Sequence, residues 1–354
     1  MPKLRSRAEG AAVPLDEADK RLLNGLQSRF PLDPQPFAAV AADLGTSESE
    51  VLERAARLLR ERIIREITPI FDTTALGYSS MLVAARVDPA NPHRAAGIIN
   101  EHPGVSHNYL RNHDFNLWFT IATAPDSKLG LDGTLEVLSE LSGAESMRKL
   151  PTLTMFKINM NLEMEGGTDK LAAPVEAVAP HPRDPVPLDG FDIAVIRALQ
   201  GPMEVRPDPY APAAQKLGVP VERMLAHLEG MVERKLLRRV AAILFHRRAG
   251  FSANGMGVWK VPEDRIMELG PQMAAVRGVS HCYRRPTYPD WPYSVFTMAH
   301  GRSKEECDAV LDGVAAVCGL GGGDRSTLYS STEFKKIRLH YFTPDYADWE
   351  ARNT

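Results

Sequence analysis

The stretch Gly104-Val-Ser-His-Asn-Tyr109 returns as Gly278-Val-Ser-His-Cys-Tyr283, 174 residues further along the chain. A second pair, Leu15-Asp-Glu-Ala-Asp19 and Leu188-Asp-Gly-Phe-Asp192, is separated by 173 residues. Because the separation changes by only one residue between these pairs, a whole unit is repeated and not merely a short motif. The sequence therefore predicts two related units in one chain, able to build a site between them with different residues on each side.

Size and charge limit the class of protein. The chain has 354 residues, of which 44% are hydrophobic and 25% charged, with a formal net charge of −3. These values are typical of a globular protein of two or three domains. A small negative charge does not suit a protein held on DNA by phosphate contacts, because such a protein needs an excess of Lys and Arg on one face.

The cysteines and the N-terminus favour a cytoplasmic protein. Cys282, Cys307 and Cys318 lack metal-type spacing, so we expect reduced thiols. No stretch approaches the roughly 20 apolar residues that a membrane span needs. The N-terminal residues lack the apolar core of a secretion signal.

Each unit begins with the pattern of a helix-turn-helix, in which apolar residues follow a helical period and a glycine precedes the third helix. Asp16 is the expected N-cap of the first helix. The expected helices are 15–30, 37–44 and 46–63 in the first unit and 191–199, 211–217 and 221–235 in the second.

The rest of each unit has the strand-helix-strand-strand-helix-strand order of a ferredoxin-like domain. In the first unit the expected strands are 81–87, 105–111, 116–123 and 153–162, and the expected helices are 92–100 and 133–141. In the second unit the expected strands are 255–261, 279–285, 293–300 and 334–341, and the expected helices are 264–273 and 305–317.

The expected domain order follows from these patterns. It is a tail (1–14), a helix-turn-helix (15–66), a ferredoxin-like domain (67–164), a Pro-rich linker (165–187), a second helix-turn-helix (188–240) and a second ferredoxin-like domain (241–354).

Local motifs in the second unit resemble one particular family. They are HRRAGFSANGMGVW (246–259), GVSHCY (278–283) and YPDWPYSVFTMAHG (288–301). With the repeat, they resemble the siroheme decarboxylases, Lrp/AsnC-like proteins that usually act as two homologous subunits. The resemblance covers nearly the whole chain. It implies an α+β fold with two tandem copies of a winged or helix-turn-helix domain, each followed by a ferredoxin-like (βαββαβ) domain of the Lrp/AsnC type.

The resemblance also implies an activity. Siroheme decarboxylases are carboxy-lyases that remove the carboxyl groups of two acetate side chains of siroheme. The products are 12,18-didecarboxysiroheme and CO2, for haem d1 or alternative haem biosynthesis. Siroheme, an iron tetrapyrrole, is then the substrate, and no further cofactor is expected. The two halves are expected to pair with each other as a pseudo-heterodimer.

Two other functions remain open. An Lrp/AsnC-type transcriptional regulator would bind DNA through its third helix, but Glu48, Glu50 and Glu53 lie in the first turns of that helix. Carboxylates there would face phosphates and base edges, which costs affinity. A non-catalytic tetrapyrrole-binding protein would hold siroheme but release no CO2. We expect neither DNA nor a membrane as a partner.

A pocket for siroheme needs guanidinium groups for the carboxylates and apolar or aromatic faces against the ring. Arginine pairs beside histidine and aromatic residues meet this need. The candidate substrate-binding residues are His246, Arg247, Arg248, Phe251, Arg284, Arg285, Arg206, Tyr210, Trp291, Tyr109 and Arg111. Because the basic cluster at 246–248 has no counterpart in the first unit, we expect one good site, formed mainly by the second unit with the first closing over it.

The candidate catalytic residues are His107, His113, His281 and Tyr283. Residues two apart in a strand share a face, which pairs His107 with Tyr109 and His281 with Tyr283. A protonated histidine or a tyrosine would supply the proton that replaces the lost carboxyl group. Alternatively, His107 or His281 would be an axial ligand of the siroheme iron. His113 has no counterpart in the second unit and suits an asymmetric role.

Overall fold

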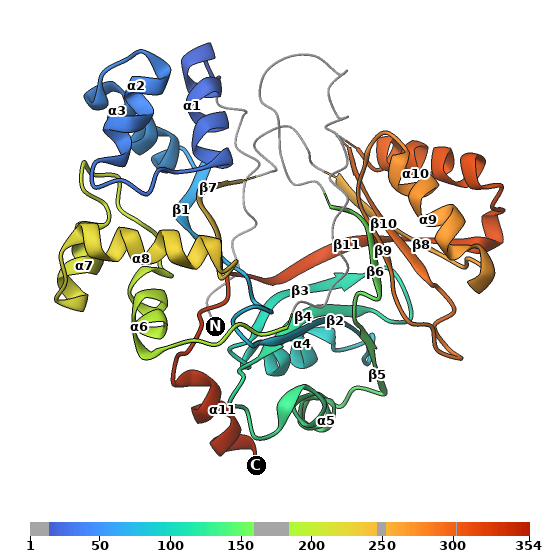
Figure 1. The fold of residues 1–354 in the computed structure, drawn as a ribbon. Coiled ribbons are helices and arrows are strands. Elements are labelled where there is room, and N and C mark those ends of the chain that lie inside the picture. The colour runs from blue at the N-terminus through green and yellow to red at the C-terminus, as the bar shows by residue number, and fades with distance from the viewer. Residues whose placement is uncertain (1–13, 159–183, 246–252, 302) are drawn as a thin grey trace.

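A computed structural model of the chain describes residues 14–158, 184–245, 253–301 and 303–354. Two clusters of three helices lie together on one side of the molecule, and sheets flanked by further helices form the rest (Figure 1). Within the described ranges, no helix is both long and apolar enough to cross a membrane.

The two helical clusters are built alike. The first consists of α1 (Glu17–Ser28), α2 (Pro36–Leu44) and α3 (Glu48–Arg60), and the second of α6 (Gly190–Leu199), α7 (Ala211–Leu217) and α8 (Val221–Glu233). Asp16 and Asp189 cap α1 and α6 in matching capping boxes. Gly45 and Gly218 each end a second helix at φ 67°, a left-handed conformation that glycine adopts without strain.

A buried aspartate ties the first helix of each cluster to the third. Asp19, 2% exposed, accepts hydrogen bonds from Arg54 at 2.9 Å and from Arg57 at 2.5 Å. Asp192, which is fully buried, is bonded to Nε2 of His227 at 2.8 Å. A buried carboxylate needs such partners, so the second aspartate of the repeated motif, Asp19 or Asp192, has a structural role in its cluster.

A two-stranded sheet joins the clusters, and the sequence pattern does not predict it. β1 (Ile64–Phe71) and β7 (Leu237–Leu244) pair antiparallel, each just after the third helix of its cluster. The expectation that the first of the third helices reaches residue 63 is wrong, because α3 ends at Arg60 and the chain turns at Arg62 (φ 58°). The other, α8, ends at Glu233, close to the expected end at about Lys235, where φ is 64°. These strands are the wings of the helix-turn-helix units.

Among the described residues, nine strands form one sheet. The first half contributes β2 (Ser79–Arg86), β3 (Val105–Arg111), β4 (Leu117–Thr123), β5 (Ser146–Leu150) and β6 (Thr154–Ile158), and the second half β8 (Ala253–Trp259), β9 (Val279–Arg284), β10 (Val295–Gly301) and β11 (Arg325–Lys336). The strand order is β5-β2-β4-β3-β11-β8-β10-β9-β6. In each half the fourth strand lies beside the first, and the third lies between the first and the second, as in a ferredoxin-like domain.

Helices cover one face of each half of the sheet (Figure 1). They are α4 (Pro92–Asn100) and α5 (Gly130–Ser142) in the first half, and α9 (Ile266–Ala275) and α10 (Lys304–Cys318) in the second. The short turns η2 (Glu263–Arg265) and η3 (Gly322–Asp324) precede α9 and follow α10 in the chain. The C-terminal helix α11 (Asp345–Asn353) buries Trp349 in the core of the first half, although it follows the second half in sequence.

The halves exchange strands, which corrects two sequence predictions. The sequence predicts one strand, 153–162, at the end of the first ferredoxin-like domain, but the structure has two strands in this region. β5 pairs with β2 and stays in the first half, and β6, which begins at Thr154, crosses to pair with β9. Of the expected strand 334–341, only 334–336 lie in a strand, at the end of β11, and 337–341 do not. β11 begins at Arg325 along β8 and continues along β3 of the first half. The two halves are therefore joined by backbone hydrogen bonds at two seams, one between β3 and β11 and the other between β6 and β9.

Each exchanged strand also carries a lysine to the other half. Nζ of Lys157 in β6 donates to the carbonyl oxygen of Ala274 in α9 at 2.9 Å. Nζ of Lys335 in β11 donates to the carbonyl oxygen of Asn100 in α4 at 2.7 Å. Positive charges suit the carboxyl ends of helices, so both contacts stabilise the seams.

Apolar side chains from both halves meet between the two parts of the sheet. Ring centroids of Trp118 and Trp291 lie 5.2 Å apart, and those of Phe115 and Trp291 lie 5.5 Å apart. We call this group the inner cluster: Ala84, Phe115, Trp118, Leu150, Met256, Val258, Trp291, Phe296 and Leu328. It is the apolar centre around which the candidate site is built.

A histidine beside α11 is buried in its neutral form. His102 is 2% exposed, its Nδ1 accepts a hydrogen bond from the backbone N–H of Gly104 at 3.0 Å, and its ring lies 4.6 Å from that of Trp349. Burial, helped by the charge of Lys335, lowers the pKa of His102 to about 3. Because the unfolded histidine binds a proton below about pH 6.5, folding becomes less favourable as the pH falls from there towards 3.

We expect His102→Gln to flatten this dependence of the unfolding free energy on pH. One titrating group accounts for up to about 1.4 kcal/mol per pH unit, all of it below about pH 6.5. Urea unfolding at a series of pH values between 5 and 7.5 measures the slope. The exposed His340 provides the control, since His340→Gln should leave the slope as it is. An unchanged slope in His102→Gln would contradict the buried, neutral state.

Candidate active site

In the first half, three predicted site residues share one face of β3. The residue between them, Asn108, is buried on the helix side, where its amide nitrogen bonds the side chain of Asn100 in α4 at 2.9 Å. Since alternate residues of a strand point to opposite faces, His107, Tyr109 and Arg111 face away from α4, towards the inner cluster.

The second half repeats this arrangement on β9. Cys282 is buried on the helix side, with its Sγ 3.6 Å from the carbonyl oxygen of Gly270 in α9. His281 and Tyr283 therefore face the inner cluster, and Arg285, just past the end of the strand, also lies against it. The prediction that each histidine pairs with a tyrosine is confirmed by ring centroid distances of 6.2 Å in the first half and 5.9 Å in the second.

Arg111 and Arg285 are partly buried cations that reach across the seams. Each stands over an aromatic ring of the inner cluster, 5.6 Å and 5.4 Å from the centroid respectively. Nη1 of Arg111 donates to the carbonyl oxygen of Leu328 at 3.2 Å, and Nη1 of Arg285 donates to that of Leu150. The Nε atom of each arginine is buried without a hydrogen-bond partner among the described residues.

This environment suits an anionic ligand. Burial lowers the pKa of Arg111 and of Arg285 to about 10, so both keep their charge at neutral pH. A buried charge is costly unless it is paired, and a carboxylate beside Nε would pair it. Of the sequence candidates that the structure describes, these two are therefore the best placed to hold carboxylate arms.

The histidines and the tyrosine differ in protonation. Burial, with nearby charges adding to it, lowers the pKa of His107 and of His281 to about 4. Burial raises the pKa of Tyr283 to about 12. At neutral pH the histidines are neutral and the tyrosine keeps its proton, so Tyr283 suits the role of acid better than a protonated histidine does.

His113 and Trp291 come together at the inner cluster. Their ring centroids lie 5.2 Å apart, and Trp291 is fully buried. Nδ1 of His113 accepts a hydrogen bond from the backbone N–H of Phe115 at 3.0 Å, and burial lowers the pKa of His113. This pair therefore forms an aromatic wall between the halves.

Two predicted binding residues lie in the helical clusters instead. Arg206 lies in an exposed loop before α7 and is paired with Asp208 at 2.6 Å. Tyr210 is fully buried in the core of the helical clusters, and its hydroxyl donates to the carbonyl oxygen of Pro31 at 2.9 Å. Sequence neighbours gave no sign that these residues are turned away from the sheet, and we leave both out of the site.

Arg284 is also left out, because it forms an ion pair with Glu263 and so turns away from the face that carries Arg285. The remaining sequence candidates, His246, Arg247, Arg248 and Phe251, lie outside the described residues.

Two cations near the inner cluster escape the sequence reasoning. Arg86, at the end of β2, stands 4.9 Å from the centroid of Phe115, and its Nε is buried without a partner in the part of the chain that is described. Lys260, just after β8, stands 5.7 Å from the centroid of Tyr293. Their separation equals that of the two Gly-Val-Ser-His motifs, so applying the repeat to basic residues would have found them.

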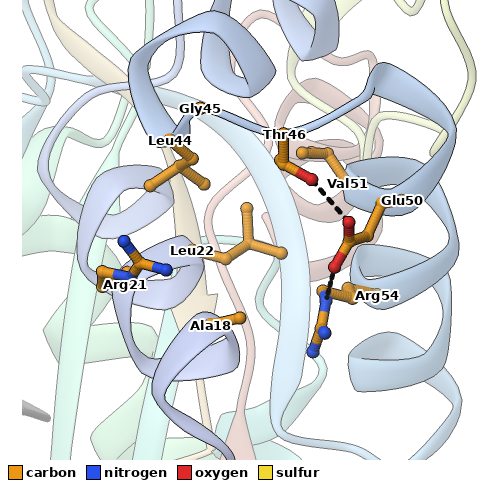
Figure 2. A pocket seen from close by; sticks show the side chains of 9 residues that line it. All are labelled: Ala18, Arg21, Leu22, Leu44, Gly45, Thr46, Glu50, Val51 and Arg54. Atoms are coloured by element: carbon orange, nitrogen blue, oxygen red, sulfur yellow. Dashed lines mark hydrogen bonds and ion pairs between the residues drawn. The ribbon is translucent and has the colours of Figure 1, made fainter.

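Glu50, Arg54 and Arg57 of α3 form their ion pairs within the first helical cluster. In Figure 2, Thr46 and Arg54 hold the carboxylate of Glu50 from two sides, at 2.5 Å and 3.0 Å. Arg54 is also bonded to Asp16 of the α1 cap at 2.8 Å. One cavity beside them has a volume of about 180 Å³, and a second, which also borders Glu50 and Arg54, has a volume of about 780 Å³. The larger one is lined by the carboxylates of Asp16, Asp19, Glu50 and Glu53 as well as by arginines, which does not favour a phosphate or the carboxylate arms of a tetrapyrrole here.

Sequence comparisons match both halves. The AsnC-like ligand binding domain matches residues 75–157 and 248–335, and the Siroheme decarboxylase NirDL-like HTH domain matches residues 19–65. The siroheme decarboxylase of Hydrogenobacter thermophilus is 36% identical over 334 residues, which cover 94% of this chain and 97% of that protein. The siroheme decarboxylase beta subunit of Methanosarcina barkeri is 35% identical over 154 residues, 43% of this chain and 100% of that subunit.

A solved structure agrees with these matches. The crystal structure of the siroheme decarboxylase NirDL in co-complex with an iron-uroporphyrin III analogue has a TM-score of 0.74 and 31% identity, over 95% of this chain and 98% of that one. The predicted mixture of helix and sheet, with helix-turn-helix and AsnC-like ligand-binding domains, is confirmed. The chain belongs to the siroheme decarboxylase family, in the form that carries both halves in one polypeptide.

Proposed function

We propose that this protein is a siroheme decarboxylase that converts the acetate side chains at positions 12 and 18 of siroheme to methyl groups, with release of two CO2. The relative with 36% identity over nearly the full length of both chains supports this assignment. So does the fold shared with a siroheme decarboxylase crystallised with an iron-uroporphyrin III analogue. The product would enter haem d1 or alternative haem biosynthesis.

The observation that carries the proposal is the pair of partly buried arginines on the inner face. Arg111 and Arg285 each offer an Nε that has no hydrogen-bond partner in the described part of the chain and lies beside an aromatic ring. This suits a carboxylate on the edge of a flat apolar macrocycle. The arginines hold arms that do not react, because clamping a reacting carboxylate would stabilise the ground state that must be lost. Arg86 and Lys260 are candidates for further arms.

The chemistry then needs one proton for each CO2. When the carbon–carbon bond to the carboxylate breaks, its electron pair stays on the methylene carbon and is delocalised into the macrocycle. A proton added to that carbon completes the methyl group. We assign this proton to the hydroxyl of Tyr283, which is protonated at neutral pH. The balance requires no oxidant or reductant, and we propose that no cofactor besides the substrate's own iron is needed.

The site joins the two halves. Each partly buried arginine donates to a carbonyl oxygen across a seam, and the half-length relatives are separate subunits. We propose that the halves arose by duplication of one helix-turn-helix and ferredoxin-like unit and now act as a pseudo-heterodimer, with the main site on the second half. We place the protein in the cytoplasm, which fits its three free cysteines, and assign it neither DNA nor a membrane as a partner.

Anaerobic incubation of the full chain with siroheme, followed by mass spectrometry, tests this function. We expect a porphyrin-type absorbance on binding and then two successive mass losses, each of one CO2, without added cofactors. Absorbance without mass loss would instead identify a tetrapyrrole carrier. Sequence-specific DNA binding that weakens with salt, with no turnover, would identify a regulator.

A further inference from the structure

The histidine on the second half is held by a serine that also contacts a backbone carbonyl oxygen. Oγ of Ser280 lies 2.8 Å from Nδ1 of His281 and donates to the backbone carbonyl oxygen of Met298 at 3.2 Å. A serine hydroxyl carries a single proton, and a carbonyl oxygen can only accept one. When Ser280 gives this proton to Met298, it is the acceptor towards His281, and Nδ1 of His281 carries the hydrogen.

The first half lacks this constraint. Oγ of Ser106 lies 3.0 Å from Nδ1 of His107 and 2.7 Å from Oγ1 of Thr120, which is itself 3.4 Å from the same Nδ1. Thr120 lies opposite His107 across the ladder, where Met298 lies opposite His281. With two hydroxyl groups that can each donate or accept, Nδ1 of His107 is free to be protonated or not. The two histidines therefore differ in their hydrogen-bond partners, because a threonine lies opposite His107 and a methionine lies opposite His281.

We propose that Ser280 is a positioning residue that holds His281 in the Nδ1–H tautomer, so that Nε2 presents a lone pair on the face of the inner cluster. In this state Nε2 accepts and does not donate a hydrogen. Its role in turnover, which rests on the proposed function, is to bind an electron-pair acceptor, either the iron of siroheme or a proton. The two residues on this face then have opposite tasks, with Tyr283 giving a proton and His281 accepting.

Long-range nitrogen–proton NMR of the full chain labelled with 15N-histidine reads the tautomer without substrate. The signals of His281, one of ten histidines, are identified by their loss in His281→Gln. We expect Nδ1–H in the wild type and in Ser280→Thr, which keeps the hydroxyl group, and a mixed or Nε2–H form in Ser280→Ala. Ser106→Ala is the matched control and should leave the His281 signals unchanged. An Nε2–H form in the wild type would overturn the proposal.

Measurements of siroheme turnover are the second part of the test. We expect Ser280→Ala to lower kcat about 10–100-fold, as is common for partners that orient a ligand or base, with a much smaller change in KM and with recovery in Ser280→Thr. A changed siroheme absorption spectrum in Ser280→Ala assigns Nε2 to the iron, and a changed rate with an unchanged spectrum assigns it to a proton. If neither changes, the positioning role is refuted. If the tautomer is found but wild-type protein consumes no siroheme, the proposed function fails and the tautomer assignment stands.

Discussion

Tyr283→Phe is expected to lower kcat for CO2 release by about 10²–10⁴-fold, the usual contribution of a positioned acid. The substitution removes only the hydroxyl group, so siroheme binding, followed by its absorbance, should change little. Burial holds the pKa of Tyr283 at about 12, so the loss should be the same from pH 6 to 9, and a rate that rises as a histidine becomes protonated would contradict the assignment.

A matched control exists on the other face of the same half. Tyr329 is bonded through its hydroxyl to Asp308 at 2.8 Å, on the helix side of the sheet. Tyr329→Phe removes the same atom from a half-buried tyrosine and should leave kcat within about twofold. Comparison with Tyr109→Phe tests which half dominates, because equal losses from Tyr109 and Tyr283 would refute a main site on the second half.

Arg285→Leu is expected to weaken siroheme binding by at least about 30-fold, since losing one partner of a buried charge pair costs roughly 2 kcal/mol or more. Titration followed by absorbance measures this. The free protein should be as stable as the wild type or more stable in urea, because the substitution removes a partly buried guanidinium without an acidic partner among the described residues. A loss of stability together with unchanged binding would make Arg285 a structural residue.

Arg325 is the control for this experiment. It also stands over an aromatic ring, 5.5 Å from the centroid of Trp259, but it is paired with Asp312 of α10 on the helix side. Arg325→Leu should cost stability and leave siroheme binding unchanged. The two substitutions thus have opposite expected effects although both remove a cation from an aromatic ring.

Local patterns account for the parts of the fold that the sequence predicts well. The helix 92–100 and the strand 105–111 have the bounds expected from their periodicity, because a proline starts the helix and Gly104 separates the two elements. The exchange of β6 and β11 is not predictable in this way. It depends on pairing between residues more than a hundred positions apart, for which a single sequence carries no local signal.

The candidate site is likewise predictable from the sequence only where a local pattern decides which way a side chain faces. Period-two alternation places His107, Tyr109 and Arg111 on one face, and the same rule sets Arg285 apart from its neighbour Arg284. It says nothing about Arg206, whose loop is directed away from the sheet by the packing of the helical cluster. Nor does it indicate that Arg111 and Arg285 have no acidic partner among the described residues, which depends on every element packed around them.

The exchanged strands bear on why relatives of this family occur both as one chain and as separate subunits. β6 and β11 close both seams with their own backbone hydrogen bonds and lysine contacts, so the geometry of the joint does not depend on the peptide connection between the halves. What fusion adds is effective concentration and a fixed one-to-one ratio. Gene fusion would thus spare the cell the need to match two expression levels. The inner face would be the same in the fused chain as in two separate halves that associate.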